Sequence, residues 1–492
     1  MIRVYNTLAR ALEPLETRAP GRVGLYVCGM TVYDYCHIGH ARAMMAFDVV
    51  VRHLRRRGYA VDFVRNHTDV DDKIINRAAQ SGVHPLQLSA QFIDELHHDL
   101  DTLGILRPTV APQVSEHIPE VVAMVQRLID RDHAYLASNG DVYFSIESFP
   151  RYGALSGKKI DDLRAGERVA VEQSKRHPGD FALWKSAAPG ELGWDAPFGR
   201  GRPGWHIECS AMAARHLGDQ FDIHGGGIDL VFPHHENEIA QSECASGHAP
   251  FARYWMHNGH LTLDSEKMSK SLGNIKRIRD IVHEVPAEAL RLLYVDTHYR
   301  SPLPFSTEKL SDALAALDRV YLAKETVEEA VSRAGAGAPA DTLNEAGRDV
   351  HRLASSFSAR FDEAMDDDFN SAAAIGYFFE LVRAINRFGN DKKARARGGG
   401  ALLPAAEAFR VVSEVFGVGA MSPTAYFDEA KVKRLRAQGK DAADIDALVA
   451  ARGAARAARD WARADQLRAE LDAQGIAVMD SPEGSTWRVR VD

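Results

Sequence analysis

The chain has 492 residues, a length that corresponds to about three domains at roughly 100–200 residues each. Its 60 Lys and Arg residues against 68 Asp and Glu residues give a formal net charge of −8, and 45% of its residues are hydrophobic. This composition excludes intrinsic disorder, a collagen-like repeat and a disulfide scaffold. It also disfavours a protein that binds nucleic acid over its whole surface, whereas local basic patches remain compatible with it.

The cysteines and the N-terminal segment indicate the compartment. Four cysteines without a CxxC pair supply neither a redox dithiol nor a zinc ribbon, and so few cysteines in a long chain fit a reducing compartment. Residues 1–21 carry charges and prolines where a secretory signal needs an apolar stretch. No run of about 18 apolar residues follows. We therefore expect a soluble, cytoplasmic protein without a membrane partner.

Strand and helix patterns alternate over the first 114 residues. Residues 23–27 form an apolar run, residues 41–57 have helical spacing, and residues 61–64 read as the next strand. Strand, helix and strand in this order predict a βαβ unit and a parallel sheet. Between residues 115 and 200 the pattern changes to a hairpin strand at 140–146 and a Gly- and Pro-rich loop at 188–204. We expect this segment to be an insertion in the first domain.

The first pattern resumes after the insertion. Residues 221–224 predict a strand, Gly225, Gly226 and Gly227 a tight turn, and residues 236–246 a helix. After about residue 304 the sequence becomes helical and Ala-rich, with loops expected at 334–340 and 394–400. From about residue 428, two basic helical stretches precede an apolar-alternating segment at 476–491. No fixed-period repeat indicates a solenoid.

A first candidate site is the sequence His37-Ile38-Gly39-His40, at the start of the helix after the first strand. A helix N-terminus presents free N–H groups and a positive dipole end, which suit a phosphate. Two imidazoles there can donate hydrogen bonds as charge builds on phosphate oxygens, and glycine permits close approach of a nucleotide. The alternative is a pair of surface histidines that cap a helix.

A second candidate is Lys267-Met268-Ser269-Lys270-Ser271. Two lysines three residues apart in a Ser- and Gly-rich stretch make a cationic loop that can close over a triphosphate. Alone, such a run is more typical of a solvated basic turn. Both motifs in one chain favour phosphoryl or nucleotidyl transfer.

These two motifs are identical to the HIGH and KMSKS signatures of class I aminoacyl-tRNA synthetases, which the chain therefore resembles. Three further segments, residues 26–34, 204–210 and 232–238, resemble the cysteinyl-tRNA synthetase family. The likeness extends over nearly the whole chain. It departs after the KMSKS motif, where the family often has aromatic and Thr residues and this chain has Ile275, Lys276 and Arg277.

The resemblance implies one Zn²⁺ per chain, since zinc ligands of the family match Cys28, Cys209, His234 and Glu238. Two thiolates, an imidazole and a carboxylate are a plausible zinc set, and His234 and Glu238 lie on one face if a helix begins by His234. The spacing alone is too scattered to exclude buried structural cysteines. A bound metal favours the thiolate form of a substrate cysteine. Such an anchor can reject serine by roughly 10⁴–10⁵, so that no editing domain is needed.

The resemblance also assigns residues around the substrates. Charge at the α-phosphate would be stabilised by His37, His40, Lys267 and Lys270. ATP and the adenylate would be bound by Gly39, His40, Asp229 and Lys270. Cysteine would be bound by Gly29, Thr68, Trp205 and His224. Mg²⁺ would accompany ATP, without a dedicated protein site in the sequence. Cys36 and Cys244 are interpreted as small buried hydrophobes.

The C-terminal third supplies the candidate RNA contacts. Arg452, Arg456, Arg459 and Arg463 recur at three- and four-residue spacing and predict a basic stripe on one helix. A second basic cluster comprises Lys431, Lys433, Arg434, Arg436 and Lys440. A solvated amphipathic helix is the alternative, because aspartates interleave. Trp461 and Trp487 could stack on unpaired bases or belong to a core.

The implied fold is α/β, with a Rossmann-like doubly wound parallel sheet as the catalytic domain at 1–114 and 201–260 and a connective insertion at 115–200. A KMSKS and stem-contact region at 261–310, an α-helical bundle that binds tRNA at 311–425 and a small anticodon-binding domain at 426–492 would follow. We expect a monomer that activates L-cysteine with ATP and transfers it to the 3′-terminal adenosine of tRNA(Cys).

Two alternatives stay open at this point. A cysteine–amino-sugar ligase of mycothiol synthesis would keep both motifs and the zinc but lack the C-terminal RNA-binding region. A non-catalytic RNA-binding paralogue would be expected to lose a catalytic His or Lys, and this chain loses none.

Overall fold

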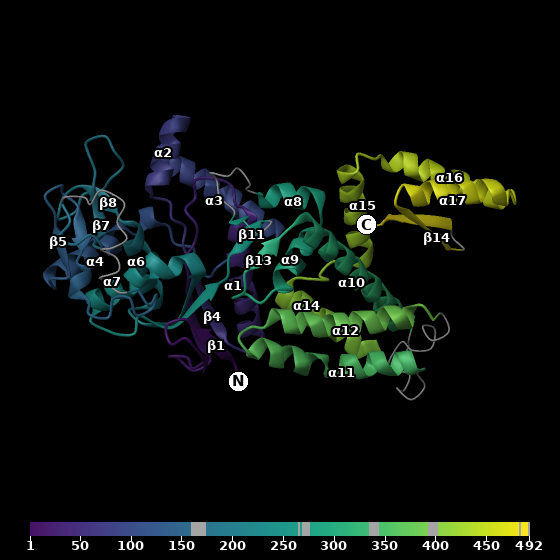
Figure 1. Ribbon diagram of the computed structural model, residues 1–492, viewed down its shortest axis with the longest axis horizontal. Helices are drawn as coiled ribbons and strands as arrows, with labels where there is room; N and C mark the ends of the chain where they lie inside the picture. The colour runs from purple at the N-terminus through teal and green to yellow at the C-terminus, as the bar shows by residue number, and fades with distance from the viewer. Residues whose placement is uncertain are drawn as a thin grey trace. The chain divides into compact units, whose positions relative to one another are not determined.

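The computed structural model describes residues 1–158, 174–263, 266–267, 276–333, 344–391, 402–481 and 484–490. The chain divides into two compact units (Figure 1). The first comprises Met1–Leu261, Tyr299–Pro302 and Asp366–Phe369, and the second comprises Thr262–His298, Leu303–Met365 and Asn370–Asp492. None of the described helices combines the length and the apolar composition that crossing a bilayer requires.

A four-stranded parallel sheet forms the centre of the first unit. Its strand order is β10 (Ala252–Asn258), β9 (Phe221–Gly227), β3 (Arg22–Val27) and β4 (Ala60–Arg65). Helix α1 (Ile38–Arg56) connects β3 to β4, as the spacing of apolar residues predicts. The chain thus leaves β3 toward β4 on one side, while β9 pairs with β3 on the other. Doubly wound sheets bind ligands where the connections diverge in this way, at the carboxyl ends of the strands.

The predicted turn at Gly225–Gly227 is wrong, because these glycines belong to strand β9 and pair with β10. A Cβ atom on Gly225 would lie 2.2 Å from the Phe47 ring of α1, and one on Gly226 would lie 2.8 Å from His235. The glycines therefore let neighbouring side chains approach the strand closely. Such a close approach is one physical reason for glycine inside a strand. The sequence pattern could not distinguish this packing requirement from a turn.

The other elements of the first unit surround this sheet. They are β1 (Arg3–Asn6), β2 (Ala11–Pro14), α2 (Asp72–Ser81), α3 (Pro85–Thr102), α6 (Trp205–Leu217) and α7 (Glu236–Ser246). Helix α7 has the bounds that the sequence predicts.

The segment between α3 and α6 folds into a helix and an antiparallel sheet, with α4 (Ile118–Asp130), β5 (Ala134–Leu136), β6 (Val142–Phe144), β7 (Phe181–Ser186) and β8 (Gly201–Pro203). Figure 1 shows this sheet beside α4, α6 and α7. Val121 of α4, Trp184 of β7 and Ile207 of α6 belong to one buried hydrophobic cluster. The insertion therefore shares a core with the helices that carry the candidate ligands.

The second unit is mainly helical, as the Ala-rich sequence predicts. A small sheet, β11 (Leu261–Leu263), β12 (Glu266–Lys267) and β13 (Leu303–Phe305), precedes and interrupts the helices. The helices before the C-terminal segment are α8 (Ile278–Glu284), α9 (Ala287–Val295), α10 (Thr307–Arg333), α11 (Glu345–Asp366), α12 (Ser371–Gly389) and α14 (Leu403–Phe416). Phe357, Phe378 and Phe409 from α11, α12 and α14 are buried together, which holds these helices as a bundle.

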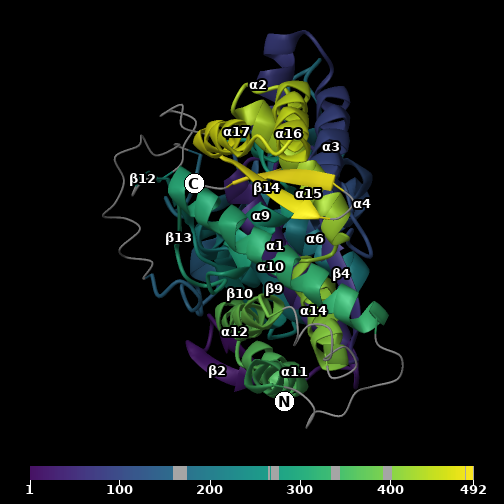
Figure 2. The ribbon, with the colours of Figure 1, turned by 90° about the vertical axis from the view of Figure 1, so that its right-hand side faces the viewer.

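The C-terminal segment has its own small core. Helices α15 (Pro423–Ala437), α16 (Ala442–Ala457) and α17 (Trp461–Ala473) precede the hairpin β14 (Ile476–Ser481) and β15 (Gly484–Val489). Figure 2 shows α16 and α17 against this hairpin. Trp487 lies in the core with Leu435 and Leu471, whereas Trp461 is 59% exposed. Of the two tryptophans, only Trp461 is therefore accessible to a partner.

The predicted single basic stripe is wrong, because the helix ends at Ala457 and Arg459 adopts a left-handed conformation with φ of 58°. Arg463 lies on the next helix. Arg452 is buried, and its guanidinium pairs with both carboxylate oxygens of Asp480 at 2.8 and 2.9 Å. Arg434 is buried and pairs with Asp318. These two arginines stabilise the fold, and the exposed arginines of this segment are Arg436, Arg456, Arg459, Arg463, Arg468 and Arg490.

Candidate active site and metal centre

The candidate site begins where strand β3 ends. Cys28 follows the last residue of β3, and the next residue, Gly29, donates its N–H to Asn66 Oδ1 at 2.8 Å. A Cβ atom on Gly29 would lie 1.7 Å from the carbonyl oxygen of Asn66. Only glycine therefore lets this segment pass beside the end of β4, and that close approach fixes the direction in which Cys28 leaves the sheet.

Three side chains from distant segments converge beside Cys28. Its Sγ lies 3.6 Å from Cys209 Sγ, 3.4 Å from His234 Nε2 and 3.4 Å from Glu238 Oε1. His234 Nε2 lies 3.0 Å from Glu238 Oε1. Cys209 comes from α6, His234 from a π-helical turn at Val231–His235, and Glu238 from the first turn of α7. Because the turn runs directly into α7, the two residues four apart face the same point.

His235 also lies in this cluster of side chains that could hold a metal ion. The ligand atoms of Cys28, His234, His235 and Glu238 all lie within 4.8 Å of one another, which is close enough to hold a metal ion. His235 Nε2 is 3.9 Å from Glu238 Oε1, and its Nδ1 is hydrogen-bonded to His257 Nε2 at 2.8 Å. The geometry thus offers five donors, of which His234 and Glu238 lie nearest to Cys28 Sγ, each at 3.4 Å.

A second layer of side chains orients the donors. His234 Nδ1 lies 3.0 Å from His206 Nδ1, and Glu238 Oε2 lies 2.8 Å from His224 Nε2. The indole of Trp205 stacks on the His234 ring at 4.4 Å between centroids. His224 lies inside strand β9 and is fully buried, so it reaches the cluster through Glu238. Such outer contacts fix the ring orientation and basicity of a metal ligand.

The electrostatics of the cluster favour anionic donors. Burial raises the pKa of Cys28 well above its usual value. The hydrogen bond from Cys28 then lowers the pKa of Cys209 to about 6. Burial alone would raise the pKa of Glu238, but His224 and His234 outweigh it and hold that pKa well below its usual value. A thiolate and a carboxylate thus face the same point near neutral pH.

The two histidines of the HIGH motif lie at the N-terminus of α1. His37 is the N-cap, and its Nδ1 accepts hydrogen bonds from the N–H groups of Gly39 at 3.2 Å and His40 at 3.3 Å. The N–H of His37 in turn reaches His40 Nδ1 at 3.5 Å, and the two rings stack 3.5 Å apart. An Nδ1 that accepts a hydrogen bond leaves the proton of a neutral imidazole on Nε2. Each histidine is therefore set to present an Nε2–H donor.

Of the remaining predicted residues, Thr68 and Asp229 follow strands of the parallel sheet, Lys267 belongs to a different sheet, and Lys270 lies outside the described residues. Thr68 is buried after β4, where its hydroxyl accepts a hydrogen bond from the Asn66 amide at 3.3 Å. Asp229 is exposed just beyond β9. Lys267 lies in β12, where its backbone pairs with Thr262.

Asn66 is a residue that the sequence analysis missed. Its Oδ1 accepts a hydrogen bond from the Gly29 N–H and lies 3.8 Å from Cys209 Sγ, and its Nδ2 donates to the Thr68 hydroxyl. Its position directly after β4 was the available signal, because polar residues at the carboxyl ends of parallel strands line ligand sites.

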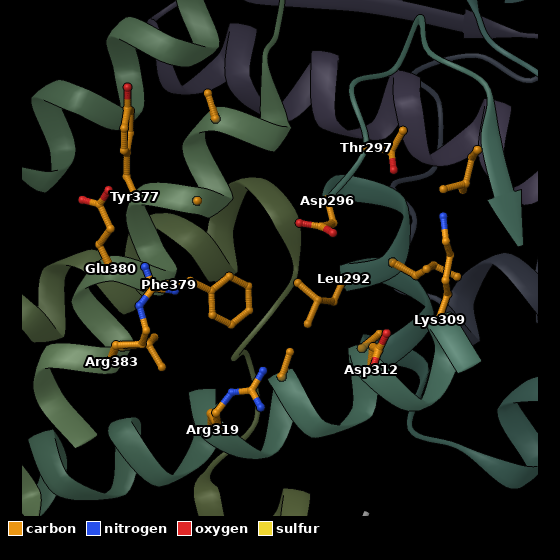
Figure 3. A pocket seen from close by; sticks show the side chains of 17 residues that line it. Leu292, Asp296, Thr297, Lys309, Asp312, Arg319, Tyr377, Phe379, Glu380 and Arg383 are labelled. Carbon is orange, nitrogen blue, oxygen red and sulfur yellow. The ribbon is translucent and has the colours of Figure 1, made fainter. Parts of the chain in front are cut away.

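The second unit contains a cavity of about 910 Å³ between α9, α10 and α12 (Figure 3). Its lining includes the cations Lys309, Arg319 and Arg383 and the acids Asp296, Asp312 and Glu380. Equal numbers of each sign give it no net attraction for a polyanion.

The catalytic region matches a known family. The model for the "tRNA synthetases class I (C) catalytic domain" matches residues 14–315. A "Cysteine--tRNA ligase" from Geobacter sulfurreducens is 50% identical over 490 residues, covering 99% of this chain and 100% of that protein. The chain belongs to the cysteine–tRNA ligase family. It is therefore an ATP-dependent aminoacyl-tRNA ligase.

Further comparisons agree with this assignment. The "DALR domain" matches residues 360–420, and the "Cysteinyl-tRNA ligase anticodon binding domain" matches residues 442–488. A second "Cysteine--tRNA ligase", from Alkalilimnicola ehrlichii, is 50% identical and covers 99% of this chain and 100% of its own length. The resemblance to the family in the sequence is thus confirmed.

Solved structures support the fold. A methionyl-tRNA synthetase of Mycobacterium tuberculosis bound to methionyl-adenylate has a TM-score of 0.62 at 14% identity, covering 80% of this chain and 92% of its own. A leucyl enzyme from Agrobacterium radiobacter in complex with tRNA has a TM-score of 0.57 at 13% identity, covering 85% of this chain and 86% of its own. The predicted class I α/β fold is confirmed.

Proposed function

We propose that the family activity is carried out here by a zinc-dependent site built from Cys28, Cys209, His234 and Glu238. The enzyme converts L-cysteine and ATP to cysteinyl-adenylate and pyrophosphate, and then transfers cysteine to the 3′-terminal adenosine of tRNA(Cys). The observation that carries the zinc proposal is the set of donor distances around Cys28.

The distances fit a tetrahedral zinc ion. Two thiolates about 2.3 Å from such an ion lie ~3.8 Å apart, and a thiolate and an imidazole or carboxylate lie ~3.5 Å apart. The corresponding separations here are 3.6 Å for Cys28 and Cys209, and 3.4 Å from Cys28 to both His234 and Glu238. His235 is the less suitable fourth donor, since its Nε2 is 3.9 Å from Glu238 Oε1.

When bound, zinc supplies a Lewis acid that favours a thiolate ligand over a hydroxyl. The chain's own contribution is to hold the donors and exclude water. Glu238 and His234 are fully buried, and Trp205 covers one face of the His234 ring. His206 and His224 hold the outer atoms of these two ligands in place. Selection of cysteine over serine then rests on this donor set.

We assign the phosphate contacts to the N-terminus of α1. The Nε2–H groups of His37 and His40 donate to the oxygens of the α-phosphate, where negative charge grows as the substrate carboxylate attacks and pyrophosphate leaves. The dipole of α1 favours the same charge. Lys267 and Lys270 add positive charge, and Asp229 binds the ribose hydroxyls. Gly29 and Thr68 border the amino acid, and Mg²⁺ enters with ATP.

The RNA partner follows from the C-terminal match. An amino-sugar ligase has no use for an anticodon-binding domain, and the match over residues 442–488 favours the tRNA ligase over that alternative. The exposed indole of Trp461 and the exposed Arg459 and Arg463 are the groups that we assign to unpaired bases and phosphates. A monomeric state and a cytoplasmic location remain predictions.

The test is aminoacylation of tRNA(Cys) by the purified enzyme with radiolabelled cysteine, alongside zinc analysis by mass spectrometry. We expect one zinc per chain and charging of tRNA(Cys) but not of other tRNAs. Cysteine activation without charging would reject the tRNA function, and full activity of a zinc-free enzyme would reject the metal proposal.

A further inference from the structure

A second histidine pair lies away from the cluster, between α4 and α6. His117 precedes the first residue of α4, and His216 lies in the last turn of α6. Their Nε2 atoms are 3.0 Å apart, and the ring centroids are 5.1 Å apart. Both side chains are half-buried, so the pair is rigid enough to keep its geometry and open enough to be reached from solvent.

The protonation of His117 is fixed by a backbone contact. Its Nδ1 lies 2.7 Å from the carbonyl oxygen of Gln113, which can only accept a hydrogen bond. Nδ1 therefore carries the proton, and Nε2 of the neutral ring presents a lone pair toward His216. A metal-bound histidine usually has this arrangement, with its second nitrogen donating to a carbonyl or carboxylate.

The spacing suits one ion. Two imidazole nitrogens 3.0 Å apart subtend an angle of about 95° at an ion that is about 2.0–2.1 Å from each. That angle is the one between neighbouring ligands in tetragonal or octahedral coordination, the geometries of Cu²⁺ and Ni²⁺ sites.

The surrounding charges distinguish this pair from a similar one. His67 and His97 also approach through Nε2, at 3.2 Å, but burial together with His97, Arg65 and Arg107 lowers the pKa of His67 to about 3. Its Nδ1 is buried and makes no hydrogen bond to a described atom. A cation there would face two arginines.

At the His117 pair, besides burial, one arginine and one carboxylate act on His216: the charge of Arg215 lowers its pKa and the charge of Glu120 raises it. Glu120 lies one turn further along α4 and contributes a favourable charge at His216. It pairs with Arg215 at 3.5 Å, and its side chain is 32% exposed, so it can turn toward an ion as a third ligand.

We propose that His117 and His216 form a second metal site, which binds a nitrogen-preferring divalent transition-metal ion such as Ni²⁺ or Cu²⁺ with Glu120 beside it. The ion would join the start of α4 to the end of α6. Because Trp205 and Cys209 lie in the first turns of α6, the site would brace the helix that carries them.

The test is calorimetric titration of the zinc-loaded enzyme with Ni²⁺ alone, at pH 7.5, for the unmodified chain and for His216→Gln. Glutamine suits the last turn of a helix and lacks the imidazole. We expect one Ni²⁺ per chain beyond the zinc. In His216→Gln we expect a loss at least as large as the roughly 10-fold cost of removing an outer partner of a metal ligand. Zinc content, measured before and after, should stay at one.

The matched control is His97→Gln, which removes one ring of the similar pair and should leave the Ni²⁺ titration unchanged. A thermal melt gives a second readout, since Ni²⁺ should raise the melting temperature of the unmodified chain but not of His216→Gln. The proposal is overturned if the unmodified chain binds no Ni²⁺ beyond scattered weak sites. It is equally overturned if His216→Gln binds Ni²⁺ as the unmodified chain does.

Discussion

Cys28 and Cys209 are 181 residues apart in sequence, yet their sulfur atoms are 3.6 Å apart. Each is held by a feature of its own segment. Gly29 passes beside Asn66 at a distance that no side chain would allow, and Cys209 is buried in α6 against the sheet. The fold thus brings the two cysteines together, and the spacing of residues in the sequence does not predict their contact.

At this scale the first prediction concerns Cys209→Ser. A hydroxyl is a poor zinc donor, so we expect zinc content well below one per chain and cysteine-dependent ATP–pyrophosphate exchange reduced by at least about 10–100-fold. The control is Cys244→Ser, since Cys244 is buried in α7 and is not one of the proposed donors. Equal zinc content in the two variants would remove Cys209 from the ligand set.

In strand β9, the side chains packed against the strand determine which residues it can contain. Its glycines are required because the Phe47 ring and His235 occupy the space that a Cβ atom would need. We expect Gly225→Ala to destabilise the enzyme by about 1–3 kcal/mol through overpacking, measured by urea unfolding.

The comparison for that variant is Gly376→Ala in α12. A Cβ atom there meets nothing within 4 Å, so alanine should be neutral or stabilise the helix by up to about 1 kcal/mol. Similar free energies of unfolding for both variants would contradict the packing explanation of β9.

The N-terminus of α1 combines two roles in one residue, because His37 both caps the helix and offers an Nε2–H donor. Two substitutions separate them. His37→Asn keeps a strong N-cap, whereas His37→Ala removes the cap at a cost of about 0.5–2 kcal/mol. Both should lower the rate of adenylate formation by roughly 10²–10³ if the imidazole stabilises phosphate charge.

Stopped-flow measurements should therefore show slower adenylate formation in both variants. Thermal unfolding should show that only His37→Ala is clearly destabilised. Near-normal adenylate formation in His37→Asn would show that His37 only caps the helix.

At the scale of the whole molecule, the chain returns to its first unit long after leaving it. Asp366 accepts a hydrogen bond from His53 Nε2 at 2.9 Å and pairs with Arg57 at 3.1 Å. Burial alone would raise the pKa of Asp366, but the His53 hydrogen bond and Arg57 outweigh it and lower that pKa. The contact thus fastens residues 366–369 to α1.

A lowered carboxylate pKa contributes stability above the ordinary pKa of aspartate, and this contribution disappears as the pH falls through the folded-state pKa. We expect Asp366→Asn to lose about 1 kcal/mol at pH 7 and little at pH 3. Urea unfolding at both pH values provides the check, and an equal loss at the two would contradict it.

Much of this architecture could be predicted from the sequence. The βαβ unit and the helical second half follow from apolar periodicity, the sequence also predicts the bounds of α7, and the motifs indicate the family. The role of the glycines in β9, the break at Arg459 and the inward pairing of Arg452 could not be predicted. The first and the last depend on a partner far away in the sequence, namely Phe47 for Gly225 and Asp480 for Arg452. Asn66, by contrast, could have been predicted from its position directly after β4.

The central claim is that a metal held by Cys28, Cys209, His234 and Glu238 selects cysteine by its thiolate. It is tested most directly by ATP–pyrophosphate exchange with cysteine or serine, before and after zinc removal by a chelator and after zinc is restored. The account predicts exchange with cysteine that exceeds exchange with serine by roughly 10⁴ or more, that is lost on zinc removal and that returns with zinc. Exchange with cysteine that persists without zinc, or equal exchange with serine, would contradict it.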